Sequence, residues 1–196
     1  MARTEDIKAL LRSIKAQEAA NYELIYVIER EPMLVSVVQD ESRKLGLSVN
    51  IIFTESNVGL PGARNLGVRV AQGEIIGFVD DDVTLAEDWS KSVESTSSEK
   101  ADAVGLTGPV SPVWIEESIL WLPKEFDWLI GCTGWYESTH VTPIWNCWGM
   151  NMAFRRRRSW EIGGFLTMPL RTRGMQGRVL ALVAPLNNRT PRWPRT

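Results

Sequence analysis

Three consecutive carboxylates, Asp80, Asp81 and Asp82, directly follow the apolar run "EIIGFV". Neighbouring carboxylates repel one another by about 1 kcal/mol per close pair even at a protein surface. One interpretation is a solvated turn in which an aspartate caps the next helix. The other is a divalent cation site, because Mg²⁺ and Mn²⁺ bind carboxylate oxygens together with substrate phosphates. A cation would offset the repulsion, and we therefore favour the second interpretation.

The pattern of apolar residues predicts the elements that must hold these acids. Strands are predicted at 22–28, 47–53, 74–79 and 101–107, and helices at about 4–14, 32–46, 56–73 and 85–95. This alternation predicts a three-layer α/β/α fold with a mostly parallel sheet. Ligands of such sheets bind beyond the carboxyl ends of the strands, which is where the acids stand.

Composition narrows the class of protein. The chain has 196 residues, 44% of them hydrophobic, which is enough for one domain with a core. A net charge of -2 gives no support for nucleic acid as a partner. One histidine and two cysteines without ligand spacing exclude a His/Cys metal centre and indicate a reduced, cytoplasmic setting. No apolar run is long enough to span a membrane, and the first residues do not resemble a signal peptide.

Two longer stretches carry a family resemblance. "GLPGARNLGVRVAQGEIIGFVDDDVTLAEDW" and "NMAFRRRRSWEIGGF" resemble family 2 glycosyltransferases, which have the GT-A fold. "WLPKEFDWLIGCTGWYE" is similar to a segment of archaeal glycosyltransferases that act on dolichyl-phosphate-linked sugars. The resemblance spans about residues 4–165. It implies a nucleotide-diphosphate sugar donor, Mn²⁺ or Mg²⁺, inversion at the anomeric carbon, and a polyprenyl or dolichyl phosphate, a lipid-linked sugar or a polysaccharide as acceptor.

The resemblance also implies roles for individual residues. Asp82 would be the direct metal ligand together with Asp80, and Asp80 or Asp81 would lie near the ribose and sugar. Arg64 and Asn65 match the donor-side helix, and an arginine near a helix start suits a diphosphate. The acceptor-side wall would consist of Trp148, Gly149, Met150 and Asn151.

The chain departs from the family at both ends. It begins at the helix that follows the family's first strand, and no carboxylate follows Phe165 to serve as catalytic base. We therefore expect a truncated GT-A domain over 1–165, with a nucleotide-sugar half at 1–107 and an acceptor half at 108–165. The Arg/Pro-rich tail, 166–196, is expected to stay outside the folded domain. Glu29 and Glu31 stand where the family has acids that contact the base of the donor.

Two features leave alternatives open. The tryptophans crowded between Trp114 and Trp160 are expected mostly to pack the second half of the fold, although some could line a groove for a sugar or lipid chain. The run "RRRR" at 155–158 is either a solvated helix face or a contact for the cytoplasmic membrane surface.

Function also has an alternative. The main expectation is sugar transfer, and the other is an inactive protein that binds nucleotide or a partner through the same scaffold. A nucleotidyltransferase would need a glycine-rich, lysine-bearing phosphate loop near the amino end, which the sequence lacks.

Overall fold

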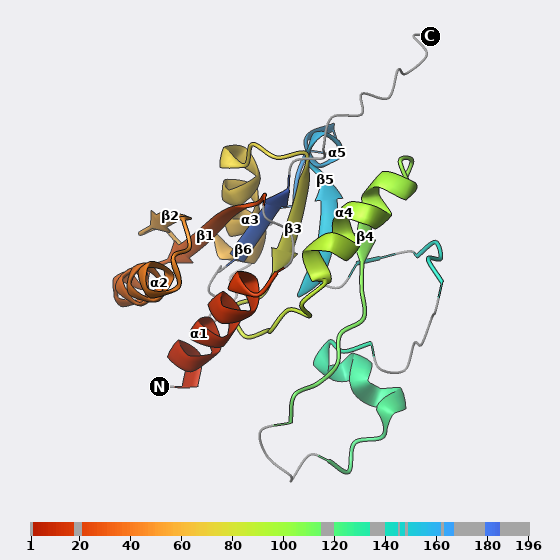
Figure 1. Ribbon diagram of the computed structural model, residues 1–196, viewed down its shortest axis with the longest axis horizontal. Coiled ribbons are helices and arrows are strands. Elements are labelled where there is room, and N and C mark those ends of the chain that lie inside the picture. The colour runs from red at the N-terminus through yellow and green to blue at the C-terminus, as the bar shows by residue number, and fades with distance from the viewer. Residues whose placement is uncertain are drawn as a thin grey trace.

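The fold is a six-stranded sheet in the order β2-β1-β6-β3-β5-β4, with helices packed on both faces (Figure 1). This computed structural model describes residues 2–17, 21–114, 120–133, 140–144, 146–147, 149–161, 163–166 and 179–184. The strands are β1 Glu23–Glu29, β2 Val49–Thr54, β3 Ile75–Val79, β4 Gly105–Thr107, β5 Asn151–Arg155 and β6 Val179–Ala184. The helices are α1 Ala2–Lys15, α2 Pro32–Leu45, α3 Gly59–Val70, α4 Trp89–Glu99, α5 Arg156–Glu161 and the 3-10 helix η2 Lys124–Ile130.

Strand β1 divides two apolar cores. Leu24, Tyr26 and Ile28 pack with α1 and α2 on one face of the sheet, while Ile25 and Val27 pack with α3 on the other. A strand covered by helices on both faces needs apolar side chains at successive positions, which is why its sequence is a continuous apolar run. The three predicted layers are therefore present in the described residues.

The strand directions differ from the prediction. The sequence predicts a mostly parallel sheet, whereas among the described strands only β1 and β2 pair in parallel. Strand β6 pairs antiparallel with both β1 and β3, and β5 pairs antiparallel with both β3 and β4. The prediction is wrong because β5 and β6 each separate two strands that run in the same direction. The sheet is mixed, but β1, β2, β3 and β4 still end at one common edge.

The tail also departs from the prediction. The segment "VLALVA" forms β6, whose backbone pairs with β1 on one side and with β3 on the other. The expectation that 166–196 stays outside the fold is therefore wrong for these six residues. A short apolar run is enough for a strand inside a sheet, and the arginines and prolines around it obscured this run in the composition. The stretches 167–178 and 185–196 lie outside the described residues.

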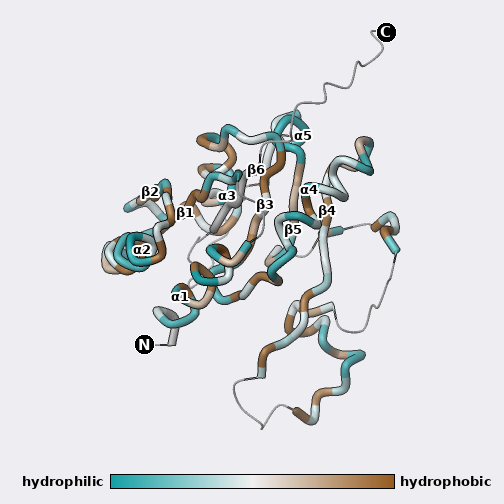
Figure 2. The backbone as a smooth tube through the Cα atoms, in the orientation of Figure 1, coloured by the Kyte–Doolittle hydropathy of each residue, from teal (hydrophilic) through white to brown (hydrophobic). Residues whose placement is uncertain are grey.

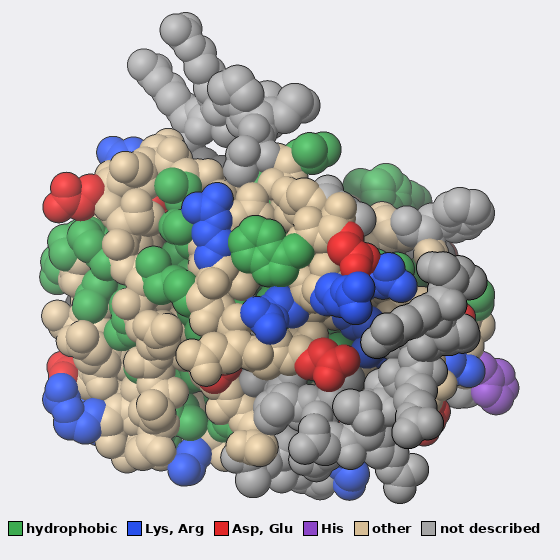
Figure 3. Space-filling model, turned by 90° about the horizontal axis from the view of Figure 1, so that it is seen from above, with side chains coloured by type: hydrophobic (Ala, Val, Ile, Leu, Met, Phe, Trp, Pro, Cys, Tyr) green, Lys and Arg blue, Asp and Glu red, His purple; other side chains and the backbone are tan. Residues whose placement is uncertain are grey.

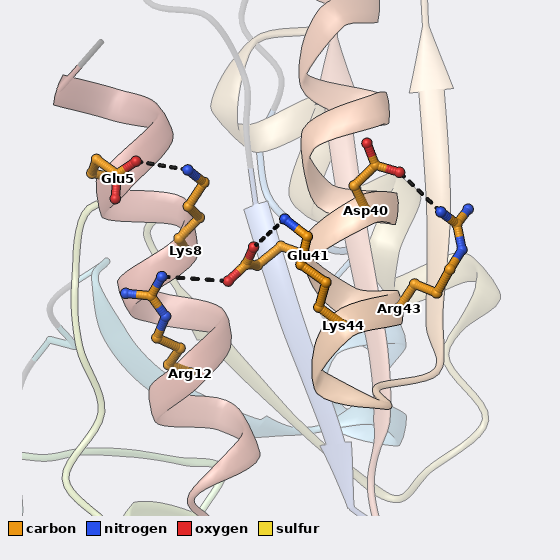
Figure 4. Close-up of polar contacts among 7 residues, drawn as sticks. All are labelled: Glu5, Lys8, Arg12, Asp40, Glu41, Arg43 and Lys44. Carbon is orange, nitrogen blue, oxygen red and sulfur yellow. Dashed lines mark hydrogen bonds and ion pairs between the residues drawn. The ribbon is translucent and has the colours of Figure 1, made fainter.

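Polar contacts tie α1 to its neighbours. Arg12 of α1 lies 3.5 Å from the Glu41 carboxylate of α2, and Lys44 lies 3.4 Å from the same carboxylate (Figure 4). Beyond the carboxyl end of α1, the Gln17 side-chain oxygen accepts the Ser90 N–H at the start of α4 (2.9 Å). This bond satisfies one of the backbone donors that a helix start leaves unpaired. The loop between the three acids and α4 is therefore anchored to α1.

Two described stretches, 111–114 and 120–132, form an excursion to one side of the sheet (Figure 2). The Thr133 N–H donates to the Val110 carbonyl (2.8 Å) and closes the base of this excursion. Trp121 and Trp128 are 76% and 50% exposed, so the packing predicted for the tryptophans is wrong for these two. They belong to an excursion that extends away from both cores. The predicted packing of three others, Trp135, Trp145 and Trp148, falls outside the described residues.

The basic run 155–158 serves two different purposes. Arg155, which is 84% buried, donates to the Ser97 carbonyl (2.6 Å) near the carboxyl end of α4. Arg157 is exposed and pairs with Glu161 (3.0 Å). Figure 3 looks onto the α5 end of the molecule, where basic and acidic side chains stand beside one another.

None of the described helices combines the length and apolarity that crossing a bilayer requires.

Replacing Arg155 with alanine should lower the free energy of unfolding by about 1–3 kcal/mol, because the carbonyls of Ser97 and Ala103 lose their charged donor. The matched variant Arg157→Ala should cost less than about 0.5 kcal/mol, since its ion pair is solvent-exposed. Urea unfolding followed by circular dichroism measures both. A loss below about 0.5 kcal/mol for both variants would mean that the run is a uniform solvated face.

Candidate functional site

The three acids lie in a turn at the carboxyl end of β3 and differ in exposure. The Asp80 side chain is 32% exposed, Asp81 is buried and Asp82 is exposed. Burial raises the pKa of Asp80, Arg64 opposes that rise, and the neighbouring Asp82 and Asp81 add to it. Desolvation therefore outweighs the ion pair, which leaves Asp80 in an environment that would gain from additional positive charge.

Arg64 connects the acids to the second half of the chain. Its guanidinium lies 3.6 Å from Asp80 Oδ1 and donates to the Gly149 carbonyl (3.0 Å). The side chain is only 11% exposed, and its buried Nε has no hydrogen-bond partner among the described residues. Burial lowers the pKa of Arg64, and Asp80 counteracts this effect. Two partly desolvated charges of opposite sign, each with a pKa shifted by burial, are typical of a functional site at the ligand-binding edge of a sheet.

The predicted acceptor-side residues Gly149, Met150 and Asn151 belong to β5 and the turn before it. Gly149 receives the Arg64 hydrogen bond, and Met150 packs against Gly131, where an added Cβ would lie 2.5 Å from its methyl group. Asn151 uses its amide internally, accepting from Trp89 Nε1 (2.8 Å) and donating to the Pro109 carbonyl (3.2 Å). Gly149 thus lies beside Arg64, whereas Asn151 ties β5 to α4. Trp148 lies outside the described residues.

Asn65 follows Arg64 on α3 and is bound to a different segment. Its side-chain nitrogen donates to the Phe165 carbonyl (2.8 Å), and its side-chain oxygen accepts the Phe165 N–H (2.9 Å). The two residues are 100 positions apart, so this pairing is a tertiary contact that no local pattern in the sequence could predict.

Glu29 has a role that the sequence did not indicate. It is fully buried at the end of β1, and its carboxylate accepts the Gly59 N–H (3.2 Å) at the first residue of α3. An acid at a helix start satisfies a free backbone donor and opposes the positive end of the helix dipole. Glu29 therefore orders the start of the helix that carries Arg64. In the sequence, its position at the end of a buried strand and the family resemblance single it out, and the resemblance implied contact with the donor base rather than a helix start.

The described residues fit a divalent cation that is shared with a substrate. They contain no group of three or more His, Cys, Asp or Glu side chains that could hold a metal by itself. Asp80 and Asp82 nevertheless provide hard oxygen donors, and Mg²⁺ usually binds one or two carboxylates and takes its remaining ligands from substrate phosphates and water. The arrangement is compatible with a cation that binds together with a diphosphate.

Comparisons with known proteins place the chain among glycosyltransferases. The chain is 29% identical over 167 residues to glucosyl-dolichyl phosphate glucuronosyltransferase of Haloferax volcanii, a match covering 85% of the chain and 53% of the relative. It is 31% identical over 91 residues to the amylovoran biosynthesis glycosyltransferase AmsB of Erwinia amylovora, covering 45% of the chain and 29% of the relative. The chain thus spans about half the length of the first relative and less of the second.

A solved structure supports the fold. The crystal structure of S. aureus TarS 1-349 matches with a TM-score of 0.60 at 17% identity, covering 87% of this chain and 49% of that one. At this identity the likeness concerns the α/β fold alone. The family model for glycosyl transferase family 2 matches residues 3–163. This range includes the three acids, Arg64 and Asn65 of α3, and the predicted acceptor-side wall. This protein is a member of glycosyl transferase family 2.

Proposed function

We propose that this chain binds a nucleotide-diphosphate sugar with Mn²⁺ or Mg²⁺ at the carboxyl end of β3 and transfers the sugar with inversion. The contact that supports this most directly is the link from Asp80 through Arg64 to the Gly149 carbonyl. It brings an acid, a cation and the acceptor-side wall together at the edge where ligands of such sheets bind.

The residues would divide the work by charge. Asp82, which is exposed, and Asp80 would hold the metal, which would supply positive charge to the diphosphate leaving group. Arg64 would offer guanidinium donors to the same diphosphate, a geometry suited to phosphate oxygens. Because its side chain is nearly buried, little water competes for those donors.

The acceptor is proposed from the relative. The Haloferax relative is named for glucosyl-dolichyl phosphate, a sugar linked to a lipid phosphate. A polyprenyl or dolichyl phosphate, or a sugar linked to one, is therefore the proposed acceptor. A phosphate acceptor is already ionised near neutral pH, whereas a sugar hydroxyl needs a general base within hydrogen-bond reach. Either acceptor would bring the chain to the cytoplasmic membrane surface, where Trp121 and Trp128 could contact lipid.

Isothermal titration of sugar nucleotides with and without Mn²⁺ tests the proposal. We expect at least one of a panel of UDP-, GDP- and dTDP-sugars to bind with a Kd below about 1 mM, and only when the metal is present. Transfer is then measured in detergent with dolichyl phosphate and with a dolichyl-phosphate-linked sugar. Binding without transfer would support the alternative of an inactive nucleotide-binding protein, and no metal-dependent binding by any sugar nucleotide would refute both.

A further inference from the structure

Asn65 holds the backbone of Phe165 by two hydrogen bonds, one to its carbonyl (2.8 Å) and one from its N–H (2.9 Å). One amide that bonds both backbone groups of a single residue fixes the orientation of that residue as well as its position. We call this pair of bonds the Asn65 clamp. The clamp engages both the oxygen and the nitrogen of the side chain, using one of its two N–H donors and one of its two lone pairs.

The clamped residue provides the surface on which Arg64 lies. The Arg64 Cζ is 5.5 Å from the centre of the Phe165 ring, within the range of a cation–π interaction. The ring also meets Phe78 edge to face, with 5.3 Å between centroids, and Phe154 in the same manner at 6.3 Å. Phe78 lies two residues before Asp80 on β3, so the ring is held between the strand of the acids and the helix of Arg64.

Two glycines lead the chain into the clamp. Gly163 and Gly164 both have positive φ, +84° and +77°, a backbone conformation that residues with a side chain rarely adopt. They differ in their surroundings. A Cβ on Gly164 would lie 2.6 Å from the Asn65 side-chain oxygen, whereas a Cβ on Gly163 would meet nothing within 4 Å among the described residues. Alanine at either position therefore imposes the same kind of backbone strain. Only the alanine at position 164 would also bring its Cβ against the Asn65 side chain.

We infer that Asn65 is a positioning residue for Arg64: its clamp holds the Phe165 ring beneath the guanidinium and so sets the reach of Arg64 toward Asp80 and the Gly149 carbonyl. This inference rests on the proposed function only in its consequence for donor binding. It gives Asn65 a task different from the donor contact that the resemblance implies, because Asn65 acts on the site through two other residues.

The first measurement needs no ligand. The Nε–H group of Arg64 is buried above an aromatic ring, so its proton resonance should be shifted by the ring and slow to exchange. Arg64→Lys identifies this signal by removing it from the ¹H–¹⁵N spectrum. We expect the shifted signal to persist in Gly163→Ala and to be lost or averaged in Gly164→Ala, Asn65→Ala and Phe165→Leu. Phe165→Tyr, which keeps the ring, should restore it.

The second measurement is donor affinity with Mn²⁺. Gly164→Ala and Phe165→Leu should raise the Kd of the sugar nucleotide about tenfold, while Gly163→Ala stays within about twofold of the wild type. Thermal midpoints confirm that the variants being compared are folded, and Phe165→Leu remains informative if Gly164→Ala does not fold.

The outcomes separate the two proposals. An unchanged Arg64 signal in folded Gly164→Ala and Phe165→Leu would overturn the inference, whatever the donor affinity. Changed Arg64 signals together with a wild-type protein that binds no sugar nucleotide would uphold the clamp and refute the proposed function. Changed signals with unchanged donor affinity would overturn the positioning role.

Discussion

Replacing Asp82 with alanine should weaken Mn²⁺-dependent binding of a sugar nucleotide by about a hundredfold or more, because the metal would lose its most accessible carboxylate. Asp80 cannot replace it, since its carboxylate is partly buried and lies 3.6 Å from the Arg64 guanidinium. The effect is measured by titrating the sugar nucleotide into both proteins at saturating Mn²⁺.

A charge-matched control distinguishes a ligand from a general electrostatic effect. Asp102 is an exposed aspartate in the turn before β4, remote in sequence from the three acids, and Asp102→Ala removes the same charge. We expect its donor affinity to stay within about twofold of the wild type. Asp102 precedes β4 and so stands at the sheet edge opposite the acids, where its exposed charge is screened by salt. Equal donor affinity in Asp82→Ala and the wild type would remove Asp82 from the metal site.

Deleting residues 167–196 should prevent cooperative folding. The deletion removes β6, which pairs with β1 along one edge and with β3 along the other. Its loss would leave the β2-β1 pair and the β3-β5-β4 group without any backbone bonds between them. Native domains are stable by only about 5–15 kcal/mol, so the loss of a central strand exceeds what the remaining contacts can offset. Thermal unfolding followed by circular dichroism should show no sharp transition.

Two further variants locate the effect in β6 itself. Ala181→Pro changes one residue in the middle of the strand, opposite Ile25 and Phe78, and should cost about 3 kcal/mol or more through the lost N–H and ring clash. A chain that ends at Ala184 keeps all of β6 and should retain its transition. If deletion of 167–196 left the transition intact, the central placement of β6 would be wrong.

Several elements of the fold were predictable because their causes are local. The apolar runs of β1 and β3 are continuous in the sequence, and Gly46 ends α2 in a left-handed conformation (φ +64°), as its position after an amphipathic helix predicts. Helix α4 begins at Trp89 rather than near 85, because its start is fixed by Gln17, whose bond to Ser90 crosses 73 residues. Helix boundaries that depend on such distant partners are not encoded nearby.

In the candidate site, too, some features follow from short stretches of sequence and others depend on distant contacts. The three acids after β3, the residue pair Arg64 and Asn65, and the turn at Gly149 can be recognised from motif and order, because each is a short stretch of sequence. The match to the family model covers all of these positions, while their roles stay predictions. The division of roles between Arg64 and Asn65 is different. Arg64 contacts Asp80 and Asn65 contacts Phe165. Neither partner can be identified from the sequence around Arg64 and Asn65.

The sequence by itself determined the class of the fold, the edge of the sheet at which the acids stand and the family to which the chain belongs, because apolar periodicity and short motifs record local requirements. Only the tertiary structure decided the order and direction of the strands, the place of β6 and the contacts that orient Arg64. Those features depend on which distant surfaces meet, since a six-residue apolar run can pair in either direction with any free strand edge. The energy that selects one pairing arises between segments that the sequence keeps far apart.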